Sequence, residues 1–199
     1  MGDDAGRRDQ GEADRAGWVS QIAAGIVRHH EDDAWFHATP AFAELSSQLS
    51  ALVREVLPDQ GLRTWFLGHL LVELLLDAEL ISARPQALED YYAALAAVDP
   101  QVVQRAVNLM APRPAERLAR FVRLFLTERF LCDYADDGKL AWRLEQVLRR
   151  AGLPPAGQAL VGVLPTARRL VSQRAADLLT PHLSDPNHPP PASFLETGI

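Results

Sequence analysis

The chain has very little cysteine and no excess of positive charge. Its 199 residues include a single cysteine, Cys132, so no disulfide can form within the chain and zinc sites built from several cysteines are excluded. The formal net charge is −6, whereas proteins that bind a phosphate backbone usually carry a basic face. The composition therefore disfavours nucleic acid as a partner.

The chain also lacks the segments that mark export or membrane insertion. Residues 1–16 are charged and hold no apolar run, so they predict no signal peptide. The most apolar stretch, residues 62–81, carries His69, Glu73 and Asp77, and charges at bilayer depth are costly. This stretch therefore predicts a buried helix, and we expect a cytoplasmic protein that does not associate with membranes.

No phosphate-binding loop rich in glycine is present, and neither Ser46 nor Ser47 lies in a nucleophile elbow. Alanine and leucine dominate instead, within a chain that is 48% apolar, and this composition favours helix. Helical periodicity recurs between proline and glycine breaks. We therefore predict an all-α fold, a single-domain bundle of about seven or eight helices.

The predicted helices occupy residues 18–36, 42–57, 62–81, 86–97, 100–110, 113–134, 140–151 and 156–179, with Asp99 as the N-cap of the fifth. The polar segment 1–16 predicts a disordered N-terminal arm. Residues 181–199 include five prolines and predict a flexible tail. The folded helical domain is expected to span residues 17–180.

The segment RHHEDDAWFH, residues 28–37, contains the first candidate site. His29 and Asp33 are four residues apart on a predicted helix, and His37 follows one turn later, so the three share a face. His30 and His37, seven residues apart, share a face as well. Imidazole and carboxylate are ordinary ligands of zinc, manganese and iron, so either set could converge on one cation. A solvent-exposed helix end is the alternative.

A second candidate lies in GHLLVELLLDAEL, residues 68–80. His69, Glu73 and Asp77 stand at i, i+4 and i+8, in one stripe on a helix that is otherwise apolar and expected to be buried. Buried carboxylates need partners or a metal. The alternative is that the stripe is the narrow exposed face of a core helix. Together the two segments form the kind of site that facing helices build inside a bundle.

Three smaller predictions concern residues outside these segments. Cys132 follows Phe130 and Leu131 and is expected to be packed and not nucleophilic. Of the adjacent Tyr91 and Tyr92, one is expected in the core and the other at its rim. The acidic loop around residues 133–139 is expected to be solvated.

At these segments the chain resembles the acyl carrier protein phosphodiesterase family, over roughly residues 20–180. The family pattern of Gly, His, Asp, an aromatic, a second acid and Pro is matched in GIVRHHEDDAWFHATP by Gly25, His29, Asp33, Trp35 and Pro40, with His37 in place of the second acid. A later pair of family aspartates corresponds to His69 and Glu73, with Leu74 in place of the histidine that follows. YYAAL and FLCDYADDGKLAWRLEQVLRRAG resemble further family segments.

The resemblance implies an HD-like helical fold and hydrolysis of a phosphoester through water activated by a divalent metal, with acyl carrier protein as partner. The cation would be held by five residues of the two segments: His29, Asp33, His37, His69 and Glu73. Either His29 or His30 could fill the first position. Asp77 or His30 would act as general base or orient a ligand, and Arg28 would clamp the phosphate. The family commonly uses manganese, and the added histidines favour zinc or iron.

A non-catalytic helical protein, which keeps the fold and binds a metal, a small ligand or a protein, is the competing hypothesis. Di-iron oxidase chemistry in a helical bundle needs paired Glu-x-x-His motifs. No such motif occurs in the chain.

Overall fold

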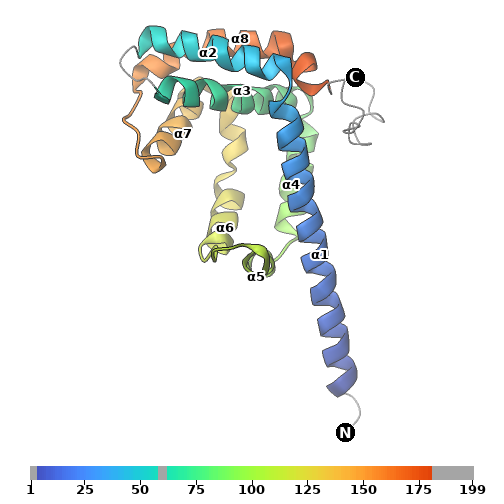
Figure 1. The fold of residues 1–199 in the computed structure, drawn as a ribbon. Coiled ribbons are helices and arrows are strands. Elements are labelled where there is room, and N and C mark those ends of the chain that lie inside the picture. The colour runs from blue at the N-terminus through green and yellow to red at the C-terminus, as the bar shows by residue number, and fades with distance from the viewer. Residues whose placement is uncertain (1–3, 58–61, 181–199) are drawn as a thin grey trace. The chain divides into compact units, whose positions relative to one another are not determined.

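The computed structural model describes the backbone of residues 4–57 and 62–180, and the side chains of residues 17–57 and 64–180. Within these ranges the chain forms eight α-helices and one 3-10 helix, and no strand (Figure 1). The predicted all-α class is confirmed. The helices are, in chain order, α1 (Asp4–His37), α2 (Pro40–Val56), α3 (Leu62–Ala83), α4 (Pro85–Ala96), α5 (Pro100–Met110), α6 (Leu118–Glu128), η2 (Phe130–Ala135), α7 (Asp137–Arg150) and α8 (Gln158–Leu179).

Helix α1 begins at Asp4, inside the segment 1–16 for which the sequence predicted a disordered arm. Arginine, glutamine, glutamate and alanine are good helix formers, so a polar composition does not prevent the helix from extending toward the N-terminus. The tail predicted over residues 181–199 lies outside the described residues. No helix in the described ranges is long and apolar enough to cross a membrane.

The contacts within the chain form two compact units, where the sequence predicted one folded domain over residues 17–180. One unit combines Met1–Asp32 with Gln86–Phe130, and the other combines Asp33–Pro85 with Leu131–Ile199. The boundary falls within α1, so the last turn of that helix belongs to the second unit.

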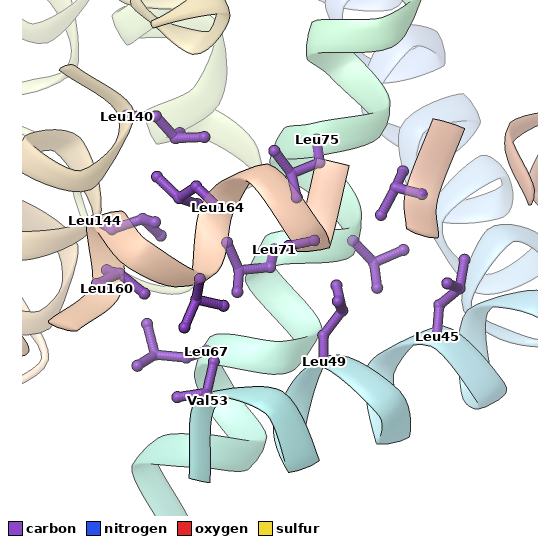
Figure 2. Close-up of a cluster of buried hydrophobic side chains, with 14 of the residues drawn as sticks. Leu45, Leu49, Val53, Leu67, Leu71, Leu75, Leu140, Leu144, Leu160 and Leu164 are labelled. Atoms are coloured by element: carbon purple, nitrogen blue, oxygen red, sulfur yellow. The ribbon is translucent and has the colours of Figure 1, made fainter. Parts of the chain in front are cut away.

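The core of the second unit is built from leucines at helical spacing on four helices. Figure 2 shows these side chains pointing toward one another from α2, α3, α7 and α8. The largest of them are almost fully buried, and each contributes roughly 2 kcal/mol of hydrophobic stabilisation. The residues labelled in Figure 2 are Leu45, Leu49, Val53, Leu67, Leu71, Leu75, Leu140, Leu144, Leu160 and Leu164.

Helices α2 and α3 approach closely where Gly68 faces two serines. A Cβ atom built on Gly68 would lie 2.7 Å from both the Ser46 carbonyl oxygen and the Ser50 backbone nitrogen. Ser50 Oγ donates to the Ser46 carbonyl at 2.6 Å, which satisfies the hydroxyl inside the contact. The missing side chain of Gly68 therefore allows this packing, one residue before His69.

A two-residue turn joins α1 to α2. Thr39 caps α2: its Oγ1 accepts from the Phe42 backbone N–H at 3.2 Å and donates to the Phe36 carbonyl at 2.9 Å. Pro40 occupies the first turn of α2, where its missing N–H costs nothing. The turn therefore fixes the end of α1, at His37, beside the start of α2.

The first unit has a small aromatic core. Tyr92 is buried and stacks on Phe125 with ring centroids 5.6 Å apart, while Tyr91 is exposed. The prediction of one core and one rim tyrosine is therefore confirmed. Asp99 caps α5 by accepting from the Gln101 backbone N–H at 2.8 Å, as predicted.

Two predictions near the end of this region are wrong. The helix expected over residues 113–134 ends at Glu128, because Arg129 adopts a left-handed conformation with φ 46°, and η2 follows. Cys132, expected to be packed, is exposed, because it lies in η2, which has no buried residue, and not in a continuation of α6. The acidic loop is also more ordered than expected: Asp133 accepts from Arg143 Nε at 2.8 Å, and Asp136 caps α7.

Candidate metal centre

Three of the predicted ligands converge in the second unit. One nitrogen each from His37 and His69 and one carboxylate oxygen from Glu73 all lie within 4.8 Å of one another. His37 is the last residue of α1, whereas the other two lie one turn apart on α3. Within the described residues this is the one group of three or more such side chains close enough to share a cation. We refer to these three residues as the His–Glu cluster.

Both imidazoles point at the same carboxylate oxygen. His37 Nε2 lies 2.9 Å from Glu73 Oε1, and His69 Nε2 lies 3.1 Å from that atom. The side chains of both histidines are 27% exposed and that of Glu73 is 32% exposed. The cluster is therefore partly desolvated yet open to solvent on one side.

Aromatic packing holds the two imidazole rings together. Phe42, on the first turn of α2, lies 4.5 Å from the His37 ring and 4.9 Å from the His69 ring, measured between centroids. The two imidazoles are 4.7 Å apart. Phe42 is buried, so it is an apolar wall against which both rings are oriented toward Glu73.

Asp33 approaches the opposite nitrogen of His37. Its Oδ2 lies 3.4 Å from His37 Nδ1, while Nε2 of the same ring faces Glu73. Asp33 was predicted as a ligand, and the structure positions it behind the ligand ring, outside the His–Glu cluster. Carboxylates commonly accept a hydrogen bond from the second nitrogen of a metal-bound histidine and so fix its orientation.

Asp77 lies one turn beyond Glu73 on α3 and is not a member of the His–Glu cluster. The pKa of Asp77 is raised to about 6, because surrounding protein desolvates its carboxyl and the Glu73 carboxylate adds like charge. Its side chain still presents surface to water, so its proton can exchange with solvent. Asp77 is thus a carboxylate that titrates near neutral pH.

The other predicted site residues belong to the first unit and take no part in the cluster. His29 and His30 are exposed on α1, with ring centroids 5.7 Å apart. Arg28 is also exposed and pairs with Asp32 at 3.3 Å. These contacts match the solvated helix surface that the sequence offered as the alternative for this segment.

Two aromatic residues beside the cluster were not predicted from the sequence. Phe42 packs on both imidazoles, and Trp65 lies with its ring centroid 5.8 Å from that of His69. Trp65 stands four residues before His69, so helical spacing alone could have assigned it to the same stripe. Phe42 carries no such signal, because its position depends on the turn between α1 and α2.

The donor set of the cluster fits a divalent cation. Metal bonds from nitrogen and oxygen ligands are about 2.0–2.2 Å long, so neighbouring ligand atoms on one cation lie about 3 Å apart. The distances of 2.9 and 3.1 Å from the two imidazole nitrogens to Glu73 Oε1 meet this requirement, and the two nitrogens lie within 4.8 Å of each other. Two imidazoles with one carboxylate is a ligand set used for zinc and iron(II), and it leaves coordination positions for water and substrate.

Comparison with protein-family models, curated proteins and solved structures finds no match for this chain.

Proposed function

We propose that this chain is a metal-dependent phosphoester hydrolase, which holds a divalent cation with His37, His69 and Glu73. The observation that carries the proposal is the convergence of two imidazole nitrogens and one carboxylate oxygen from two helices, α1 and α3, all within 4.8 Å of one another. The reaction class comes from the resemblance of GIVRHHEDDAWFHATP to the acyl carrier protein phosphodiesterase family. Zinc, iron(II) and manganese are the candidate cations.

A bound divalent cation lowers the pKa of water and polarises a phosphoryl oxygen. His37, His69 and Glu73 provide three ligands, and their partial exposure admits a substrate from solvent. Asp33 faces the second nitrogen of His37 at 3.4 Å and would help to orient that ring. Asp77, one turn beyond Glu73 on α3, would take up the proton of that water or return one to the leaving group.

The substrate is a phosphoester, and acyl carrier protein is the partner that the resemblance implies. The chain itself has a net charge of −6, so an acidic partner would encounter a repulsive field. Small phosphoesters therefore come first in a substrate screen. The cytoplasm is the proposed compartment, in keeping with a single cysteine and no disulfide framework.

A groove in the first unit supports a second candidate, a non-catalytic binding protein. The groove has a volume of about 790 Å³ and lies between α1 and α5. Its lining is mainly apolar, as is usual for sites that bind small molecules. The residues that line it are Trp18, Val19, Val102, Arg105, Ala106, Asn108 and Leu109.

Metal content and hydrolysis, measured on the same preparations, distinguish the two candidates. Purified wild type, His69→Ala and His30→Ala are incubated with zinc, manganese or iron(II), desalted, and analysed by mass spectrometry. We expect near-stoichiometric metal in wild type and His30→Ala and none in His69→Ala, with hydrolysis of bis(4-nitrophenyl) phosphate following the metal. Wild type without metal would refute the hydrolase, and metal without hydrolysis of any phosphoester would favour the binding protein.

A further inference from the structure

Trp65 leaves most of its indole in solvent beside the His–Glu cluster. The residue is 58% exposed, and its ring centroid lies 5.8 Å from that of His69 at an interplanar angle of 39°. Trp65, His69 and Glu73 are spaced four residues apart on α3, so they follow one another along a single face. A large exposed apolar surface therefore lies next to His69, one turn before it on α3.

Few large apolar side chains are exposed in the described part of this unit. Among the described residues of the second unit, the large apolar side chains that are exposed are Val56, Trp65 and Trp142. Trp142, on α7, is 53% exposed, and the guanidinium of Arg143 lies over its ring at 4.7 Å. The indole of Trp65 is therefore the exposed aromatic surface that adjoins candidate metal ligands, and Trp142 is a matched tryptophan elsewhere in the unit.

We propose that Trp65 is a specificity-determining residue, whose indole packs against a flat aromatic group carried by the substrate next to its phosphate. This inference rests on the proposed function. The chain would then prefer aryl phosphoesters to alkyl phosphoesters. In this it would differ from the family it resembles, because the phosphopantetheine arm that the family releases has no aromatic ring.

The distances support this assignment. A phosphate bound by a cation at the cluster would lie near His69, and a substituent on its ester oxygen would extend by one or two bonds. Aromatic rings interact favourably when their centroids lie 4.5–7 Å apart. Because the indole packs beside His69 at 5.8 Å, a ring attached to that phosphate could reach the exposed face of Trp65. The stacking energy of such a pair corresponds to an affinity gain of about 3- to 10-fold. An alkyl substituent of small size gains little from the same surface.

Binding of two phosphonates to the zinc-loaded full chain tests the inference. Phenylphosphonate and methylphosphonate cannot be hydrolysed at the carbon–phosphorus bond, so calorimetry reports affinity independently of turnover. We expect wild type to bind phenylphosphonate about 3- to 10-fold more tightly. Trp65→Ala should lose that preference and keep its zinc affinity, while Trp65→Phe should retain most of the preference and Trp142→Ala all of it.

The alternative outcomes separate the two proposals. Equal affinities in wild type, or a preference that persists in Trp65→Ala, would overturn the role of Trp65 and leave the metal site intact. Loss of zinc from Trp65→Ala would mean that the indole positions His69, and the specificity role would again be wrong. Wild type that binds no zinc would overturn both proposals.

Discussion

His37 Nε2 and Glu73 Oε1 lie 2.9 Å apart although the two residues are separated by 36 positions in the chain. The contact joins the end of α1 to the middle of α3 within one compact unit. His69 Nε2 reaches the same oxygen from one turn away at 3.1 Å. A cation held by these three atoms would therefore link two helices that no covalent bond connects directly.

Because the cation would bind the folded chain and not the unfolded one, zinc should stabilise the fold. At a free zinc concentration of about 100 times the Kd, the gain is about 2.7 kcal/mol, or a rise in Tm of about 5–10 °C for a chain of this size. Differential scanning fluorimetry with and without zinc measures this shift, and a chelator should reverse it.

Variants of single histidines locate the zinc that causes the shift. His69→Ala should abolish the rise in Tm, whereas His30→Ala, an exposed residue of the other unit, should preserve it. An equal rise in His69→Ala would mean that zinc binds elsewhere and would contradict the assignment of the His–Glu cluster.

Asp33→Asn should weaken zinc binding without abolishing it. The Asp33 carboxylate faces His37 Nδ1 at 3.4 Å, and loss of such an orienting partner typically costs 10- to 100-fold in metal affinity. The longer distance and the 47% exposure of Asp33 favour about 10-fold. Competition with a chromophoric chelator measures the change.

Asp32→Asn is the matched control for this variant, because Asp32 pairs with Arg28 and not with the cluster. Its zinc affinity should equal that of wild type. A loss well beyond about 100-fold in Asp33→Asn would instead indicate a direct ligand, as the sequence predicted for Asp33.

The helices of this chain were predictable because their ends carry strong local signals. Prolines open α2, α4 and α5, and the leucine spacing of α3 is helical. Pro165, which was expected to interrupt the last helix, lies inside the continuous α8. The end of α6 was missed because Arg129 adopts a left-handed conformation, which glycine usually signals and arginine does not. The exposure of Cys132 follows from that missed boundary.

The site was predictable only as far as spacing determines it. His69 and Glu73 lie on one face of one helix, so their pairing followed from the sequence. The position of Asp33 depends on the orientation of the His37 ring, whose Nδ1 faces Asp33 and whose Nε2 faces Glu73. Packing of Phe42 on that ring influences this orientation. Spacing does not determine a ring orientation, so the sequence could not show that Asp33 lies outside the group of three candidate ligands.

Asp77→Asn should stabilise the metal-free protein at neutral pH and leave its stability unchanged in acid. The carboxyl has a pKa of about 6 in the folded chain against an ordinary value of 3.8. Between these values the folded state binds more protons than the unfolded state, so wild type loses stability as pH rises from about 4 to about 6.

The neutral asparagine does not suffer this loss. After allowance for the solvent around the exposed side chain, we expect a gain of about 1 kcal/mol at pH 7.5, and none below pH 3.8. Urea unfolding in the presence of a chelator, over pH 3.5 to 8, measures the difference. A variant less stable than wild type at pH 7.5 would show that the Asp77 carboxylate has a stabilising partner.

Gly68→Ala should destabilise the second unit, because its Cβ would lie 2.7 Å from two backbone atoms of α2, at Ser46 and Ser50. Backbone cannot move aside as a flexible side chain can, so the helices must separate, at a cost of about 2–3 kcal/mol. The adjacent His69 would move with α3, so zinc affinity should fall as well.

Gly162→Ala is the matched control. Gly162 lies inside α8 of the same unit, with open space around the position of an added Cβ atom, and the substitution should increase stability by about 0.5–1 kcal/mol through helix propensity. Urea unfolding of both variants, with zinc titrations of the folded proteins, tests the pair. Equal stabilities would mean that α2 and α3 pack less closely than Gly68 indicates, and normal zinc affinity in Gly68→Ala would mean that the His–Glu cluster tolerates a shift of α3.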